Sequence, residues 1–290
     1  MSFLDRMGVP VRGSRILELG PGKNYGSTIF LSCFGAKCAV ADKYLSNWDN
    51  DCHPVFYSAL GKAIEQKFAK ADITPIKKLL RQNKYCSDII QRLSSASEDL
   101  SILPANYFDV VLSNAVLEHI ANPTRSLKEI YRITKAGGWN IHQIDYRDHR
   151  DYEQPLEYLF VEENDFASMF KDRNGECGNR YRASEFISFF KNAGFLIDAV
   201  EHNMFATSEY LASVKERVQE KSMAYSEEDL SVLSGRIYAA KPVSPAVTES
   251  AVCRSGKKLA DLSLQCIDFS PKHFSGPNFV SRLLIRTPLK

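Results

Sequence analysis

The sequence predicts an α/β protein built on an open, doubly wound and mostly parallel β-sheet with helices on both faces. Strand-like and helix-like segments alternate along most of the chain, which is the pattern of successive βαβ units. A glycine-rich turn joins the first strand to the first helix. The chain has 290 residues, of which 44% are hydrophobic and 25% charged, as expected for a soluble globular domain with additions.

The first βαβ unit is predicted over residues 15–42. The apolar run RILELG indicates a short buried strand over 15–20, and the following helix is expected over 27–34, where Gly35 stops it. The segment KCAVAD then indicates a second strand that ends at Asp42. A strand, a glycine turn, a helix and a strand ending in an acid are the parts of such a unit.

Residues 44–96 are expected to form a helical insertion. The segments YSALGKAIEQKFAKA and ITPIKKLLRQNKYCSDIIQRL place apolar residues at helical spacing, and Pro75 suits the first turn of a helix. This region is longer than a crossover between parallel strands needs. Part of it is therefore predicted to act as a lid over a site.

The second half of the chain continues the alternation. YFDVVLSNAV indicates a strand over 108–113, and PTRSLKEIYRITKAGG indicates a helix closed by Gly137 and Gly138 before the strand WNIHQID. RYRASEFISFFKNAGF is an amphipathic helix ending at Gly194, LIDAVEHN a strand, and LSGRIYAAKP holds a last strand. Residues 1–242 are thus expected to form one domain, and 243–290 a C-terminal extension of unknown role.

Composition excludes several classes of protein. The net charge of +2 gives no broad field for nucleic acid, so no nucleic-acid partner is expected. The seven cysteines are odd in number and show no CxxC spacing, which favours reduced thiols in a cytoplasmic protein over disulfides or a zinc cluster. The first residues lack the apolar core of a signal peptide, and no apolar run approaches the ~18 residues of a membrane span.

The glycine turn between residues 20 and 26 is a candidate nucleotide-binding loop. Its backbone can approach a ligand closely, and Asp42 lies where an acid accepts hydrogen bonds from a ribose diol. A tight turn with no ligand remains the alternative. The G-x-G-x-x-G spacing of nicotinamide cofactors fails here, and Glu18 just before the turn would repel a pyrophosphate but accept an ammonium group.

Taken together, LELGPG, VAD, YFDVVLSNAVLEHI and SLKEIYRITKAGG resemble a class I S-adenosylmethionine-dependent methyltransferase. The likeness is to the small-molecule group with an LEH…GG signature (methyltransferase type 11-like), over about residues 12–242. It implies a Rossmann-like, seven-stranded sheet, with residues 146–183 as a lid on the acceptor side. It also implies S-adenosyl-L-methionine as the cofactor.

The resemblance implies roles for individual residues at the cofactor. Asn24 stands where the family has a third glycine, and a long stretch separates Asp42 from Ser97. The methionine portion, ribose, adenine and methyl donor would be held by Glu18, Gly20, Pro21, Gly22, Asp42, Lys43, Ser97, Glu98, Ser113 and Asn114.

Three residues at the expected carboxyl ends of the strands are candidates for catalysis: His119, His142 and Asp145. Direct displacement at a sulfonium mainly needs alignment, worth ~7–11 kcal/mol, and a hydroxyl nucleophile would gain from a histidine base. The alternatives are satisfied structural histidines and an aspartate N-cap. The cluster HQIDYRDH is a possible metal site, but a hydrogen-bonding lining is preferred and no metal is expected.

Substrate contacts are expected from Tyr146, Arg180 and Arg182, although a solvated helix start is the alternative for the arginines. The predicted function is methyl transfer to an oxygen, or a nitrogen, of a small-molecule or sugar-containing acceptor. A nicotinamide oxidoreductase and a catalytically silent binding protein are the rival interpretations. A homodimer through residues 243–290 is a further possibility.

Overall fold

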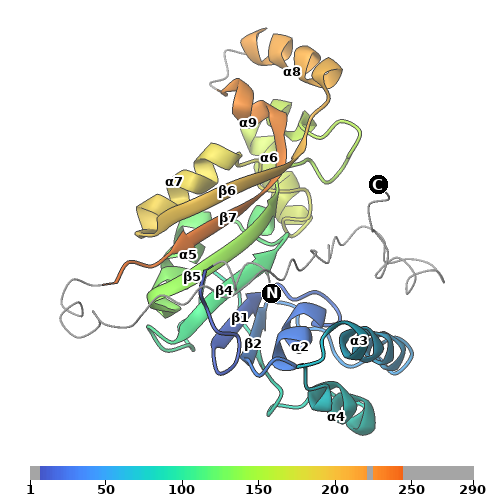
Figure 1. The fold of residues 1–290 in the computed structure, drawn as a ribbon. Coiled ribbons are helices and arrows are strands. Elements are labelled where there is room, and N and C mark those ends of the chain that lie inside the picture. The colour runs from blue at the N-terminus through green and yellow to red at the C-terminus, as the bar shows by residue number, and fades with distance from the viewer. Residues whose placement is uncertain (1–6, 221–224, 244–290) are drawn as a thin grey trace, which may run out of the picture.

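The computed structural model describes residues 7–220 and 225–243, and it confirms the predicted α/β fold (Figure 1). Within this part, seven strands form one sheet in the order β3-β2-β1-β4-β5-β7-β6. The pairs among β1 to β5 are parallel, whereas β7 is antiparallel to β5 and β6. The strands are β1 (Arg15–Leu19), β2 (Lys37–Asp42), β3 (Ile90–Ser94), β4 (Phe108–Asn114), β5 (Thr134–Asp145), β6 (Leu196–Phe205) and β7 (Val232–Ala240).

Helices pack on both faces of the sheet. Helices α2, α3 and α4 lie together beside β1, β2 and β3, where Ile29, Tyr57 and Leu79 join one buried cluster (Figure 1). On the opposite face, Ile130 of α5 and Phe186 of α7 belong to the largest buried cluster. The helices are α2 (Gly26–Ser32), α3 (His53–Lys67), α4 (Thr74–Gln82), α5 (Pro123–Ile133), α6 (Glu163–Asp172), α7 (Ala183–Ala193), α8 (Ser208–Glu220) and α9 (Glu227–Ser231), with 3₁₀ turns η1 (Leu117–His119) and η2 (Glu157–Phe160).

The prediction of helix through the end of residues 44–96 is wrong, because β3 lies there. Ile90 pairs with Cys38 of β2, and the pairing continues in parallel to Ser94. Ile90 and Leu93 are the buried residues of β3, and their separation of three also fits a helix face. Helices α3 and α4 form the crossover between β2 and β3, and their buried residues belong to the same hydrophobic cluster as residues of both strands. Their role as a lid stays a prediction.

The glycines predicted to close the helix before β5 have another role. Helix α5 ends at Ile133, and β5 begins at the next residue. Gly137 has φ +74° and donates its N–H to the carbonyl of Lys241 at 2.8 Å. The β4–β5 register shifts at this point, so both glycines belong to an irregular start of β5.

The other predicted regions are only partly described. Residues 146–183 contain η2 and α6, and their function as an acceptor lid stays a prediction. The C-terminal extension, with the homodimer assigned to it, lies outside the described residues beyond Val243. No helix in the described ranges is long and apolar enough to cross a membrane.

Candidate active site

Gly20 begins the turn at the carboxyl end of β1. It has φ +58°, and its N–H donates to the carbonyl of Ala41 at 3.0 Å. A Cβ atom at this position would lie 2.3 Å from Cγ2 of Val116 in the loop after β4. The missing side chain of Gly20 therefore lets the loops after β1 and β4 pack against each other.

Gly22 is the open part of the same turn. Its φ is +68°, and no heavy atom lies within 4 Å of the place a Cβ would take. Pro21 beside it is half-buried. Glu18 is buried and accepts a hydrogen bond from the Thr28 hydroxyl of α2, and burial raises the pKa of its carboxyl group. The carboxyl group of Glu18 is thus engaged by α2, whereas the backbone at Gly22 is open to a ligand.

Asp42 closes β2 beside this turn. One of its carboxylate oxygens accepts the N–H of Tyr44 at 2.7 Å, and the other has no hydrogen bond within the described residues. Lys43 places its ammonium group 5.2 Å from the centre of the Tyr44 ring. After β3, the Ser97 hydroxyl donates to Glu98 at 3.2 Å. The open backbone of Gly22 and the available oxygen of Asp42 fit the nucleoside cofactor that the sequence predicts.

Ser113 and His142 form a buried pair toward the carboxyl ends of β4 and β5. They are register partners, and the Ser113 hydroxyl lies 2.7 Å from Nδ1 of His142. The His142 ring packs 5.4 Å from the Phe190 ring of α7, and burial lowers the pKa of His142 to about 3. The half-buried Asn114 ends β4. The geometry of His142 favours a neutral residue of the core, and a catalytic role for it stays a prediction.

His119 and Asp145 lie at the carboxyl-end side of β4 and β5, and each lies beside His149. The His119 ring centre lies 5.0 Å from that of His149, whose Nε2 is 3.6 Å from Asp145. Arg147 holds the Asp145 carboxylate with two bonds of 2.7 and 2.5 Å. Burial acts to raise the pKa of Asp145, but Arg147 and His149 outweigh it and hold that pKa below its usual value.

His119 has a defined tautomer. Its Nδ1 lies 2.8 Å from the carbonyl of Gly175, so Nδ1 carries the proton and donates it. Nε2 is then the basic nitrogen. Burial lowers the pKa of His119, against the effect of the Gly175 bond, so the ring is neutral at pH 7.

Glu118 is a site residue that sequence reasoning did not single out. Its carboxyl group is buried, and Oε1 accepts the N–H of Asp145 at 3.2 Å. Oε2 has no hydrogen-bond partner in the described part of the chain. Burial, together with the Asp145 carboxylate, raises the pKa of Glu118 well above its usual value. The signal was present, since Glu118 directly precedes His119 in the quoted motif.

The residues predicted to bind substrate are used mainly by the scaffold. Arg182 is fully buried, and its guanidinium donates to the carbonyls of Tyr146, Asp229 and Val232 and to the Tyr158 hydroxyl. These bonds occupy the five donors of an arginine.

Arg180 and Tyr146 differ from Arg182 in what surrounds them. Arg180 donates to the carbonyl of Val161 at 2.9 Å and to Glu163, and its guanidinium lies 3.9 Å from the centre of the Phe166 ring. Tyr146 is buried, and its hydroxyl has no partner among the described residues. Substrate recognition by all three residues stays a prediction, and Arg182 has no donor left for it.

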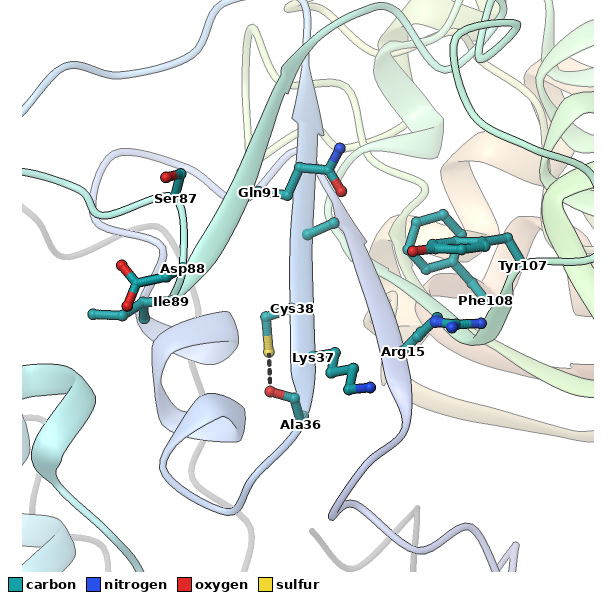
Figure 2. Close-up of a pocket in the computed structure, with 11 residues that line it drawn as sticks. Arg15, Ala36, Lys37, Cys38, Ser87, Asp88, Ile89, Gln91, Tyr107 and Phe108 are labelled. Carbon is teal, nitrogen blue, oxygen red and sulfur yellow. Dashed lines mark hydrogen bonds between the residues drawn. The ribbon is translucent and has the colours of Figure 1, made fainter.

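A groove lies on the opposite side of the sheet from the turn after β1, at the amino ends of the strands. The groove has a volume of about 210 Å³ and lies where β1, β2 and β4 begin. Figure 2 shows Arg15, Lys37, Gln91 and Tyr107 around it. Ligands of open α/β sheets bind at the carboxyl ends of the strands, so this groove is not the predicted site. Over the described ranges, no group of three or more His, Cys, Asp or Glu side chains is placed to hold a metal ion.

Comparisons with known proteins identify the family. A family described as the methyltransferase domain matches residues 1–200. Among solved structures, an S-adenosylmethionine-dependent methyltransferase from Mesorhizobium loti is similar at 15% identity, over 83% of this chain and 96% of that one, with a TM-score of 0.48. Phosphoethanolamine N-methyltransferase 2 from Haemonchus contortus, in complex with S-adenosyl-L-methionine, is similar at 18% identity, over 83% of this chain and 51% of that one, with a TM-score of 0.47.

A search of curated proteins finds no match. The family match nevertheless spans more than half of the 290 residues. The chain therefore belongs to the methyltransferase domain family, and the prediction of a methyltransferase that uses S-adenosyl-L-methionine is confirmed.

Proposed function

We propose that this enzyme methylates a hydroxyl oxygen of a small polar acceptor, with His119 as the general base. The observation that carries the proposal is the bond from Nδ1 of His119 to the carbonyl of Gly175, at 2.8 Å. It leaves the lone pair of Nε2 to receive a proton. The lowered pKa of the ring keeps it unprotonated at neutral pH, as a base must be.

The cofactor is proposed to lie over the turn after β1. Gly22 offers open backbone to the methionine portion, and Asp42 offers a carboxylate oxygen to the ribose. Asn114 and the pair Ser97–Glu98 remain candidates near the methyl donor and the adenine. When bound, S-adenosyl-L-methionine supplies a methyl group on a sulfonium, which takes the electrons of the broken carbon–sulfur bond.

The acceptor is proposed to lie against His119 and His149, whose rings contact each other edge-on with centres 5.0 Å apart. Nε2 of His119 takes the hydroxyl proton as the new oxygen–carbon bond forms. Asp145 remains ionised through its bonds with Arg147, and its carboxylate lies 3.6 Å from Nε2 of His149. The Tyr152 ring, 5.6 Å from His149 and 4.8 Å from Arg147, is placed to border the acceptor.

The substitution H119N tests the base. Asparagine keeps a donor for the carbonyl of Gly175 but offers no basic nitrogen. We expect kcat to fall ~10²–10⁴-fold while the affinity for S-adenosylhomocysteine, measured by calorimetry, is unchanged.

The acceptor atom is tested with paired compounds and a radiolabelled methyl group. Catechol against 1,2-diaminobenzene, and glycerol against 2-amino-1,3-propanediol, offer hydroxyl and amine groups on similar frames. Label on hydroxyl oxygens supports the proposal. Label on nitrogen alone, or an H119N variant as fast as the wild type, contradicts it.

The cysteines support a reducing, cytoplasmic setting for this reaction. Cys33, Cys38, Cys52, Cys86 and Cys177 are all free thiols, and four of them are buried. Reduced thiols of this kind are usual where glutathione keeps proteins reduced.

A further inference from the structure

A group of aromatic side chains surrounds the cofactor turn on the side of α3. Trp48 precedes α3, His53 and Tyr57 belong to it, and Tyr85 follows α4. We call these four residues the aromatic clamp. The Trp48 ring stacks on Tyr57 at 5.6 Å and lies 5.0 Å from His53, and Tyr85 lies 5.5 Å from Trp48. The clamp is therefore one packed unit rather than four separate contacts.

The polar atoms of the clamp converge on two carbonyls of the turn. Nε2 of His53 lies 3.1 Å from the carbonyl of Lys23, and the Tyr85 hydroxyl donates to the same oxygen at 3.2 Å. The Tyr57 hydroxyl donates to the carbonyl of Asn24. The peptide planes that follow Gly22 are thus fixed from one side.

The donors of the clamp are defined by their surroundings. The N–H of Asp49 donates to Nδ1 of His53 at 2.7 Å, which places the His53 proton on Nε2, facing Lys23. Burial raises the pKa of both Tyr57 and Tyr85, so their hydroxyls keep their protons at neutral pH. All three side chains therefore act as donors under ordinary conditions.

The turn needs such support because it is strained. Tyr25 has φ +50°, a left-handed conformation that costs an L-residue ~1–2 kcal/mol. It is also the N-cap of α2, and its side chain makes no capping bond. A Cβ at Gly26 would lie 2.9 Å from the Phe56 ring, so α3 packs directly against the start of α2. The side-chain oxygen of Asn24 accepts the N–H of Gly26 at 3.1 Å, next to this contact.

We propose that the aromatic clamp positions the turn for the cofactor and thereby sets the affinity for S-adenosyl-L-methionine. Its residues are positioning residues, since they act through the carbonyls of Lys23 and Asn24. A turn held in its binding conformation loses little freedom when a ligand binds. Without the clamp, the strain at Tyr25 favours other conformations, and only a fraction of molecules remain competent.

The double variant Y57F/Y85F removes two hydroxyl donors and keeps the rings. We expect the Kd for S-adenosylhomocysteine, measured by calorimetry, to rise about tenfold. Tyr131 on α5 lies on the other face of the sheet, so Y131F is the matched control and is expected to bind as the wild type does. Circular dichroism at the binding temperature confirms that each variant is folded. An unchanged Kd in folded Y57F/Y85F overturns the proposal.

His53 gives a second, independent series. In H53Q the amide nitrogen replaces the Nε2 donor, whereas H53A removes it. We expect near wild-type affinity for H53Q and a Kd at least threefold higher for H53A. Equal affinity in all three proteins contradicts the proposal, even if Y57F/Y85F does not fold.

Fluorescence provides a readout besides affinity. The chain has two tryptophans, so W139F leaves Trp48 as the single reporter in the clamp. We expect S-adenosylhomocysteine to change Trp48 emission in this background, and the change to be lost with Y57F/Y85F. No change on saturation in the W139F protein argues against coupling between clamp and turn. None of these measurements requires an acceptor, so they are independent of the proposed oxygen methylation.

Discussion

Glu118 shows how a single residue is altered by its place in the fold. Its pKa lies near 4.3 in an unfolded chain and is raised well above that in the folded protein. The neutral form therefore contributes stability that is fully present below about pH 4.3 and is lost as the pH rises toward the folded pKa. Acid thus favours this part of the fold.

The substitution E118Q is expected to remove this pH dependence. Glutamine stays neutral, and its Oε1 can still accept the N–H of Asp145. The free energy of unfolding of E118Q, relative to the wild type, should rise from pH 5 upward until the folded pKa is passed. Urea unfolding at a series of pH values measures it, with the exposed Glu153→Gln as control. A constant difference across this range would show that Glu118 is ionised in the fold.

At the same scale, sequence reasoning found some of the site and missed the rest. His119 was expected after the fourth strand and Asp145 at the end of the fifth, and the structure places them there, each beside His149. A catalytic role for either residue stays a prediction. Glu118 and Arg147 were missed because their roles depend on burial and on the Asp145 carboxylate. For His142, the sequence predicted a place toward the carboxyl end of β5. It did not predict that the ring packs into the core against Phe190 of α7.

Among the elements, the best predicted are those whose pattern of apolar residues is consistent with only one type of secondary structure. KCAVAD forms β2 over Lys37–Asp42 as expected, because β-branched and small apolar residues fill a strand buried on both faces. β3 was missed because it is half-exposed at the sheet's edge, where its alternation is weak. Its assignment depends on pairing with β2, a long-range contact that no local pattern contains.

Arg182 makes hydrogen bonds that connect four elements, and its replacement tests how much they contribute to stability. Its guanidinium links the start of α7 to the end of β5, to α9 and to the start of β7. R182K keeps the charge but leaves carbonyls unpaired, each costing ~1–3 kcal/mol. We expect the unfolding free energy to fall by at least about 2 kcal/mol, and Tm by about 4–8 °C.

Calorimetry and thermal melts check this, with the exposed Arg125→Lys on α5 as the control. Hydrogen exchange should also become faster at α9 and at the start of β7. A Tm for R182K equal to that of R125K would mean that the bonds of Arg182 add no stability.

At the scale of the whole molecule, the topology separates the loops at the carboxyl ends of the strands from those at the amino ends. The turn after β1, the end of β2 and the loops after β4 and β5 lie together at the carboxyl ends of the strands, because β1 to β5 are parallel. The groove in Figure 2 lies at the amino ends. A ligand at the carboxyl ends therefore contacts a different set of loops from a ligand at the amino ends.

This separation predicts a pattern of hydrogen exchange. At short labelling times, when local opening dominates exchange, S-adenosylhomocysteine should slow exchange in residues 20–26, 42–48 and 113–119. Residues 35–38 and 105–108, beside the groove of Figure 2, should exchange as in the free protein, and β6 serves as an internal control. Protection at the amino ends instead would place the cofactor in that groove. It would also remove the physical basis for assigning Gly22 and Asp42 to binding, since neither residue can reach a ligand held at the opposite ends of the strands.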